Sequence, residues 1–195
     1  AAVVHNSALF EQTREDSWTD PMTGLPNTRY MFLHLSRELA RAGRGDGEVT
    51  FMVLDLDGFK DINDTHGHHV GDQTLRLVAA RLRAAIRPYD ICARYAGDEF
   101  VVVLSGCGRD EAESKRRELL DAIADVKVGL GQGTTIGVRA SIGAAVFPHD
   151  GTSYEHLLAA ADARMYRHKN ERRPLLAPAV DRVTDSAGAR SVPIR

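Results

Sequence analysis

The stretch Arg94–Leu104, "RYAGDEFVVVL", joins two runs of strand-forming residues through a short turn of small and acidic residues. Aromatic and β-branched residues favour extended chains, and Gly97 supplies the backbone freedom that a tight turn requires. We therefore predict a β-hairpin built from "ICARY" and "FVVVL", with Asp98 and Glu99 at its tip. Two adjacent carboxylates directly before a buried strand call for a chemical explanation.

Outward from the hairpin, strand and helix patterns alternate along the chain. "VTFMVLDLD", residues 49–57, predicts a strand, and residues 126–147 predict a pair of strands interrupted by glycines. Helical spacing of apolar residues predicts a helix after Asn27, one that begins at Asp72 and stops at Pro88, and others near residues 109–125 and after Ser153. Residues 58–72 lack an apolar period and predict a long polar loop.

This order of elements is β-α-β-β-α-β, which is typical of the ferredoxin-like fold. We predict an α/β (α+β) domain whose central antiparallel, palm-like sheet is covered by helices on one face. The second face and the hairpin tip are then available for a ligand.

Composition limits the class of protein. The chain has 195 residues, 43% hydrophobic and 27% charged, with a formal net charge of −2, which is ordinary for one soluble domain. We expect no nucleic-acid polymer as partner, no membrane insertion and a cytoplasmic location, because no polybasic segment, signal peptide or long apolar run is present. Residues 1–19 predict a linker helix, 20–173 the domain, and 174–195 a flexible tail.

A cluster of carboxylates is expected at one end of the sheet. Asp55 and Asp57 end their strand on the same side, because side chains alternate along a strand. If that strand neighbours the hairpin, Asp55 lies close to Asp98 and Glu99. Crowded like charges repel unless a cation lies between them, and oxygen ligands suit Mg²⁺. Each short motif alone also fits a solvated turn, but together they favour metal-assisted phosphoryl chemistry.

The polar segment after this strand has features of a nucleotide site. Backbone N–H groups around residues 58–60 can hold phosphate oxygens, while Asn63 and Asp72 offer an amide and a carboxylate that suit the edge of a guanine base. The same two residues would equally well cap turns, so both interpretations stay open at this point.

With these residues in view, the chain resembles the GGDEF family of diguanylate cyclase domains over roughly residues 20–173. The motifs that carry the resemblance occur in the family's order: "DPMTGLPN", "DLDGFKDINDTHGHHVGD", "RYAGDEF", "ASIGAAVFP" and "ADARMYRHKNERR". The resemblance implies an enzyme that condenses two GTP molecules into cyclic di-GMP and two pyrophosphates. It also implies Mg²⁺, with Mn²⁺ as an alternative ion, and a head-to-head homodimer.

The resemblance assigns roles to individual residues. Asp55, Asp98 and the carbonyl of Leu56 correspond to the metal ligands, and Glu99 to the second essential acid of the signature. The substrate-binding positions are Asn63 and Asp72 for guanine, Phe59, Lys60, Lys169 and Arg173 for the phosphates, and Gly97 of the signature. Ala96 stands where the signature usually has its first glycine, and Arg172 is an alternative to Arg173.

A second site is implied by "RPYD". Arg87 and Asp90 form an R-x-x-D motif at the family's distance before the signature, the position of its product-inhibition site. An arginine fork suits guanine N7 and O6 or phosphate, and a carboxylate accepts guanine N–H groups.

Two rival classes remain. A catalytically silent module would bind cyclic di-GMP or GTP as a sensor, and Ala96 keeps this alternative open. A purely structural dimerisation domain would not need the metal acids and the guanine pair together. The segment "SALFEQTRED" resembles the exit helix of an upstream sensor domain in a longer chain.

Overall fold

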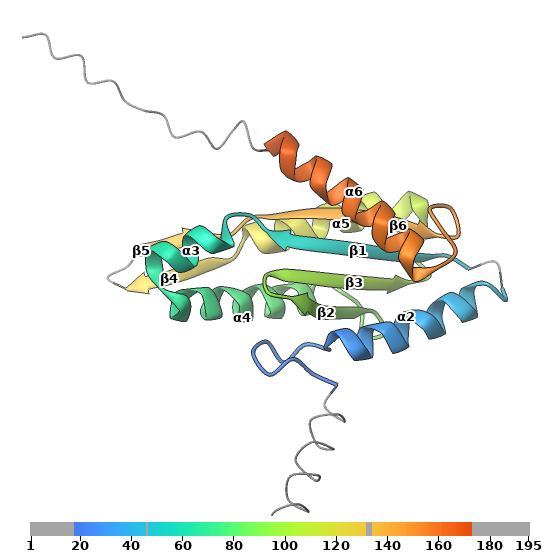
Figure 1. The fold of residues 1–195 in the computed structure, drawn as a ribbon, viewed down its shortest axis with the longest axis horizontal. Coiled ribbons are helices and arrows are strands. Elements are labelled where there is room, and N and C mark those ends of the chain that lie inside the picture. Colours follow the sequence, from blue (N-terminus) through green and yellow to red (C-terminus); the bar gives the residue numbers. More distant parts are fainter. Residues whose placement is uncertain (1–17, 46, 132–133, 173–195) are drawn as a thin grey trace, which may run out of the picture.

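The computed structural model describes residues 18–45, 47–131 and 134–172 (Figure 1). The predicted linker helix and flexible tail fall almost entirely outside these residues. The helices are α2 (Thr28–Ala42), α3 (Phe59–His66), α4 (His68–Ala84), α5 (Arg109–Ala124) and α6 (Tyr154–Arg172). The strands are β1 (Val49–Leu56), β2 (Ile91–Ala96), β3 (Glu99–Ser105), β4 (Lys127–Gly131), β5 (Thr134–Gly137) and β6 (Ala140–Phe147).

The central sheet confirms the predicted fold class. Its strand order is β2-β3-β1-β6, and each neighbouring pair is antiparallel. This is the ferredoxin-like arrangement, in which the first strand and the second strand of the hairpin lie at the centre. The predicted hairpin is β2–β3, and Gly97 in its turn has a φ of +50°.

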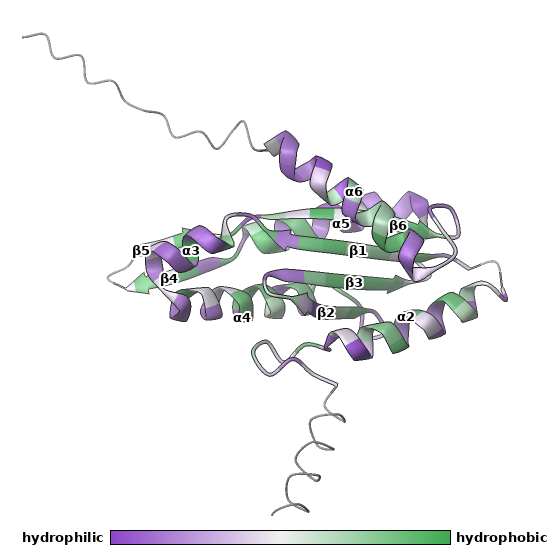
Figure 2. Cartoon of the chain, viewed as in Figure 1, coloured by the Kyte–Doolittle hydropathy of each residue, from purple (hydrophilic) through white to green (hydrophobic). Residues whose placement is uncertain are grey.

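Helices cover both faces of this sheet, so the prediction of one open face was wrong. Alternate residues of β1 belong to different cores: Met52 and Leu54 pack in the core that includes residues of α4 and α5, while Phe51 and Val53 pack in the core that includes residues of α2 and α6. Seven of the eight residues of β1 are buried. A continuous apolar run of this kind is typical of a strand covered on both sides, and Figure 2 shows the central strands as hydrophobic along most of their length.

Two predictions about local structure also need correction. Residues 58–72 form α3 and the start of α4 rather than a loop, with Gly67 at a φ of +82° between the two helices. Residues 126–147 form three strands rather than two: β4 and β5 make a separate hairpin, and β6 joins the central sheet. Glycines at these junctions interrupt the apolar periodicity. The sequence pattern therefore did not predict α3, the start of α4 or the third strand.

Helix caps and buried cysteines agree with the sequence. The Tyr30 N–H donates to Asn27 Oδ1 at 3.0 Å and begins α2, and the His156 N–H donates to Ser153 Oγ at 3.4 Å at the start of α6. Cys92 and Cys107 are unpaired and buried, as expected for core residues. Within the described residues, no helix is long and apolar enough to span a membrane.

An ion pair fastens α6 to the free edge of the sheet. Arg164 donates from Nη1 to Asp150 Oδ2 at 2.6 Å and from Nη2 to Asp150 Oδ1 at 2.7 Å, and Nη1 also donates to the Ala144 carbonyl at 2.6 Å. Asp150 in turn accepts the Val146 N–H at 2.8 Å. The hydrogen bonds from Arg164 hold the pKa of Asp150 at about 2, below its ordinary 3.8.

We expect Asp150→Asn to lower the free energy of unfolding at neutral pH by about 2 kcal/mol, because a partly buried, charged hydrogen-bond network is broken. Since the folded pKa is depressed, this contribution is present above the ordinary pKa of 3.8 and is lost as the pH falls toward 2. Thermal denaturation of parent and variant between pH 2 and pH 7 measures it. Glu118→Gln, which breaks an exposed pair with Lys115, is the control. A parent–variant gap that stays constant with pH would contradict the assignment.

Candidate active site

Three carboxylates meet where β1 ends and the β2–β3 turn begins. Asp55 lies directly opposite Glu99 in the register of β1 and β3, and Asp98 is the preceding turn residue. All three side chains are partly exposed, while the core behind them begins at the buried Leu54 and Phe100. The predicted neighbourhood of Asp55, Asp98 and Glu99 is therefore confirmed as geometry.

Burial and the neighbouring carboxylates raise the pKa values of Asp98 and Glu99. Burial and the nearby Asp55 raise the pKa of Asp98. Burial, Asp55 and Asp98 raise the pKa of Glu99, and Asp162 of α6 acts in the same direction. Groups that resist ionisation in this way favour a bound cation.

Lys169 supplies one positive charge to the group. Its ammonium donates to Asp55 Oδ1 at 2.5 Å from the last turns of α6. Burial acts to lower the pKa of Lys169, but the hydrogen bond to Asp55 and the Asp57 and Asp98 carboxylates raise it above its ordinary value. Sequence reasoning placed Lys169 on a phosphate and missed its contact with Asp55.

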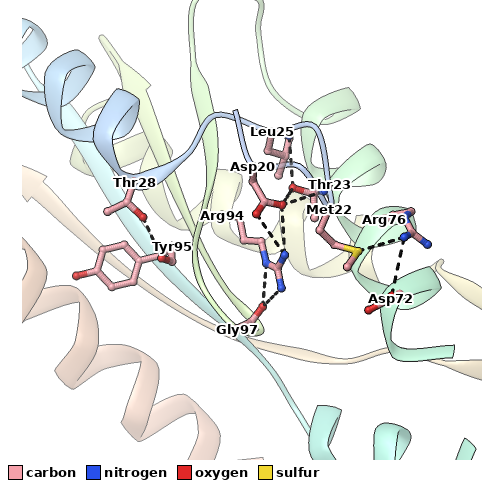
Figure 3. A network of polar contacts seen from close by, with 10 residues as sticks. All are labelled: Asp20, Met22, Thr23, Leu25, Thr28, Asp72, Arg76, Arg94, Tyr95 and Gly97. Carbon is pink, nitrogen blue, oxygen red and sulfur yellow. Dashed lines mark hydrogen bonds and ion pairs between the residues drawn. The ribbon is translucent and has the colours of Figure 1, made fainter. Parts of the chain in front are cut away.

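A clamp of two residues holds the turn that carries Asp98 (Figure 3). Arg94 donates from Nε and Nη2 to the Gly97 carbonyl at 3.0 and 2.8 Å. Its Nη1 donates to both carboxylate oxygens of Asp20 at 3.2 and 3.3 Å. Burial acts to raise the pKa of Asp20, but hydrogen bonds from Thr23 and Arg94 outweigh burial and leave that pKa below its ordinary value. Asp20 and Arg94 belong to two separate sequence motifs, and no local pattern predicts their contact.

The nucleotide-binding candidates gather where α3 approaches α4. Phe59 and Lys60 are the first residues of α3, whose opening N–H groups lack partners within the helix. Asn63 lies against Gly71, where an added Cβ would stand 2.0 Å from Asn63 Oδ1. Gly71 thus allows Asn63 to lie beside the backbone that precedes Asp72.

Asp72 is held loosely on its own helix. Its carboxylate lies 3.9 Å from Arg76 Nη2, and Arg76 also donates to Met22 Sδ at 3.2 Å (Figure 3). The Asp72 side chain is 39% exposed, so its carboxylate is accessible to a ligand.

The donor set fits a hard divalent cation. Asp55, Asp98 and the Leu56 carbonyl offer oxygen ligands only, and the Lys169 ammonium already shows that Asp55 attracts positive charge. Among the described residues, no group of three or more His, Cys, Asp or Glu side chains is gathered as a complete metal cage. Magnesium typically takes one or two carboxylates and completes its shell with water and substrate phosphates, so two carboxylates suffice.

Arg87 and Asp90 lie at the opposite end of β2 from the signature turn. Asp90 accepts the N–H groups of Arg87 and Ser105, both at 3.1 Å, and Arg87 donates from Nη1 to the Tyr89 hydroxyl at 3.0 Å. Both residues line two neighbouring cavities of about 840 and 210 Å³. The pair therefore forms an ordered turn with open space beside it, six strand residues away from the carboxylates.

Comparison with known proteins decides the family. Residues 17–174 match the family model described as "Diguanylate cyclase, GGDEF domain". The chain belongs to the GGDEF diguanylate cyclase domain family. Members of this family generally use a divalent metal, in agreement with the donor set around Asp55. Arg173, one predicted phosphate ligand, lies outside the described residues, as does the side chain of Arg172.

The curated relatives are identical to the chain at about a third of the aligned positions. It is 34% identical over 166 residues to "Diguanylate cyclase DosC" of Escherichia coli (strain K12), covering 85% of the chain and 36% of that protein. It is 35% identical over 161 residues to "Response regulator PleD" of Caulobacter vibrioides, covering 82% of the chain and 36% of that protein. The chain thus spans about a third of the length of these relatives.

Solved structures agree on the fold. The diguanylate cyclase SiaD of Pseudomonas aeruginosa, solved with its activator SiaC, has a TM-score of 0.75 and 30% identity, covering 87% of the chain and 68% of SiaD. The coiled coil and GGDEF domain of DgcB from Caulobacter crescentus, solved with c-di-GMP, has a TM-score of 0.73 and 28% identity, covering 87% and 90%.

Proposed function

We propose that this domain is an active diguanylate cyclase that condenses two GTP molecules into cyclic di-GMP with release of two pyrophosphates. The observation that carries the proposal is the meeting of Asp55, Asp98 and Glu99 at a clamped signature turn, in a domain of this family. Each half-reaction joins the ribose 3′-oxygen of one GTP to the α-phosphorus of the other, and pyrophosphate leaves.

In this proposal the chain's own residues bind and orient the substrate. Asn63 and Asp72 read guanine, with Asp72 accepting the N1–H and N2–H groups. The N–H groups of Phe59 and Lys60 hold phosphate oxygens at the start of α3, the Gly97 backbone allows close approach of the nucleotide, and Lys169 adds positive charge beside Asp55.

Mg²⁺, with Mn²⁺ as an alternative, would be held by Asp55, Asp98 and the Leu56 carbonyl, where it would neutralise phosphate charge and polarise the reacting oxygens. Glu99 accepts the proton of the 3′-hydroxyl. Its raised pKa supports this role, because a general base works best when its pKa approaches the working pH.

Two subunits are required in this account, because each domain holds one GTP and the bond forms between two. We therefore propose a head-to-head homodimer that brings two signature turns together. We also propose an upstream sensor domain that controls this encounter, and a cytoplasmic location where GTP is supplied. The proposed segments are a linker helix over residues 1–19, the domain over 20–173 and a flexible tail over 174–195.

The binding-only alternative rests on Ala96, which replaces a glycine of the signature. Ala96 is exposed and lies at the irregularity that ends β2, so its methyl group projects from the surface of the free domain. The three carboxylates favour the enzyme, because a sensor that binds product through Arg87 and Asp90 would not need them.

We expect Asp98→Asn to abolish cyclic di-GMP formation while the domain stays folded, because the variant removes a charged metal ligand at a partly exposed turn. Purified chain is incubated with GTP and Mg²⁺, products are separated by chromatography, and circular dichroism verifies the fold. Asp64→Asn, which changes an exposed carboxylate on α3, is the matched control. Absence of product from the parent, or parental turnover in Asp98→Asn, would contradict the proposed function.

We further propose that product bound at Arg87 and Asp90 inhibits the enzyme by holding two domains apart. Arg87→Ala should weaken cyclic di-GMP binding by about tenfold or more, because a charge-assisted contact is lost. Its initial rate should stay at the parental value, since the site lies at the other end of β2. Calorimetry and progress curves measure both quantities. Equal product affinity and an equally early plateau in the variant would remove Arg87 from the inhibitory site.

A further inference from the structure

A charged residue lies on the inward stripe of α5. The buried residues of this helix are Ala112, Leu119 and Ile123, and Arg116 occupies the position between them at helical spacing. The Arg116 side chain is only 19% exposed. A guanidinium in the place of an apolar residue needs a reason, because burying a charge is unfavourable unless every donor finds a partner.

The hydrogen bonds of Arg116 leave one of its nitrogen atoms unsatisfied. Nε and Nη2 each donate to a carboxylate oxygen of Glu113 at 2.8 Å. Nη1 is buried and has no hydrogen-bond partner among the described residues. Buried polar atoms are rarely left unpaired, so this nitrogen marks a place where an acceptor is missing.

Arg116 lines a cleft of about 460 Å³ at the free edge of the sheet, between α5, β6 and α6. The helices α5 and α6 pack on opposite faces of the sheet, and both contact β6. The wall from α6 is made by Arg164, Arg167, His168 and Glu171, which recur at intervals of three and four residues and so share one helix face. None of the residues proposed for the signature-turn site or for the R-x-x-D site lines this cleft.

The charges around the cleft favour an anion. Four arginines line it against three carboxylates. Arg164 and Arg109 are engaged by Asp150, whereas Arg167 makes no ion pair with any described residue. Glu113 and Glu171 also line the cleft, and Glu113 already pairs with Arg116 and Arg117. Because the arginines outnumber the carboxylates, the net charge of the cleft favours an anion.

We propose that the α5–β6–α6 cleft binds a small anion with a diphosphate group, held by Arg116 from α5 and Arg167 from α6. Guanidinium groups match phosphate oxygens in geometry, and two of them on different helices suit two linked phosphoryl groups. Nη1 is buried in the free domain, so a hydrogen bond to an oxygen of this anion requires the Arg116 side chain to shift toward the cleft. The diphosphate is either free pyrophosphate or the phosphate tail of a nucleotide.

Calorimetric titration of the full 195-residue chain with inorganic pyrophosphate tests the proposal. The titration uses EDTA and a Lys169→Met background, so that binding at the signature turn is suppressed. Arg116→Gln and Arg167→Gln should each weaken binding by about tenfold. Arg117→Gln is the control, because Arg117 also pairs with Glu113, at 3.0 Å, but is 71% exposed and does not line the cleft.

A second titration with GTP under the same conditions distinguishes the two sources of diphosphate. Tighter binding of pyrophosphate would identify the free anion, and tighter binding of GTP would identify the nucleotide tail, provided that the two arginine variants weaken the tighter interaction. Absence of binding for both probes, or binding that is equally strong in Arg116→Gln, Arg167→Gln and the parent, would overturn the proposal. Arg167 is exposed, so its variant decides the outcome even if Arg116→Gln fails to fold.

Discussion

The site depends on the two hydrogen bonds that Arg94 donates to the Gly97 carbonyl. Asp20 holds the Arg94 guanidinium in place by accepting a hydrogen bond from its Nη1. A turn with Gly97 at positive φ is free to adopt several conformations, and two neighbouring carboxylates raise its electrostatic energy. Arg94 restricts that freedom, because a charged, bidentate donor fixes both the position and the plane of the carbonyl. Asp20 and Thr23 orient Arg94 through a network that spans the first and third sequence motifs.

The sheet then brings the rest of the chemistry to this turn. Pairing of β1 with β3 sets Asp55 opposite Glu99, and packing of α6 on the sheet places Lys169 on Asp55. The close approach at Gly71 brings Asn63 of α3 to the start of α4. Helices on both faces bury β1 along its length, so the ends of the strands are where polar side chains gather.

Sequence reasoning succeeded where the signal is local. The β2–β3 hairpin, the cap at Asn27 and the neighbourhood of Asp55 and Asp98 follow from turn chemistry and from the alternation of side chains along strands. It failed where the structure depends on distant partners. Asp20 and Arg94 are 74 residues apart, and no local pattern links them.

The helix α3 was missed for a different reason. It buries none of its residues, so it has no apolar stripe, and Gly67 and Gly71 interrupt the pattern that follows. The unbroken apolar run of β1 indicates burial on both faces of the sheet. The prediction of an open sheet face did not take that run into account.

We expect the Asp20–Arg94–Gly97 clamp to position the signature carboxylates for catalysis. The most direct test is the initial rate of cyclic di-GMP formation by Arg94→Gln, with GTP and Mg²⁺, beside Arg41→Gln as a variant of an exposed arginine. We expect a rate at least about tenfold below the parent in Arg94→Gln, because small displacements of reacting groups reduce rates strongly, and a parental rate in Arg41→Gln. A folded Arg94→Gln variant that turns over GTP at the parental rate would contradict it.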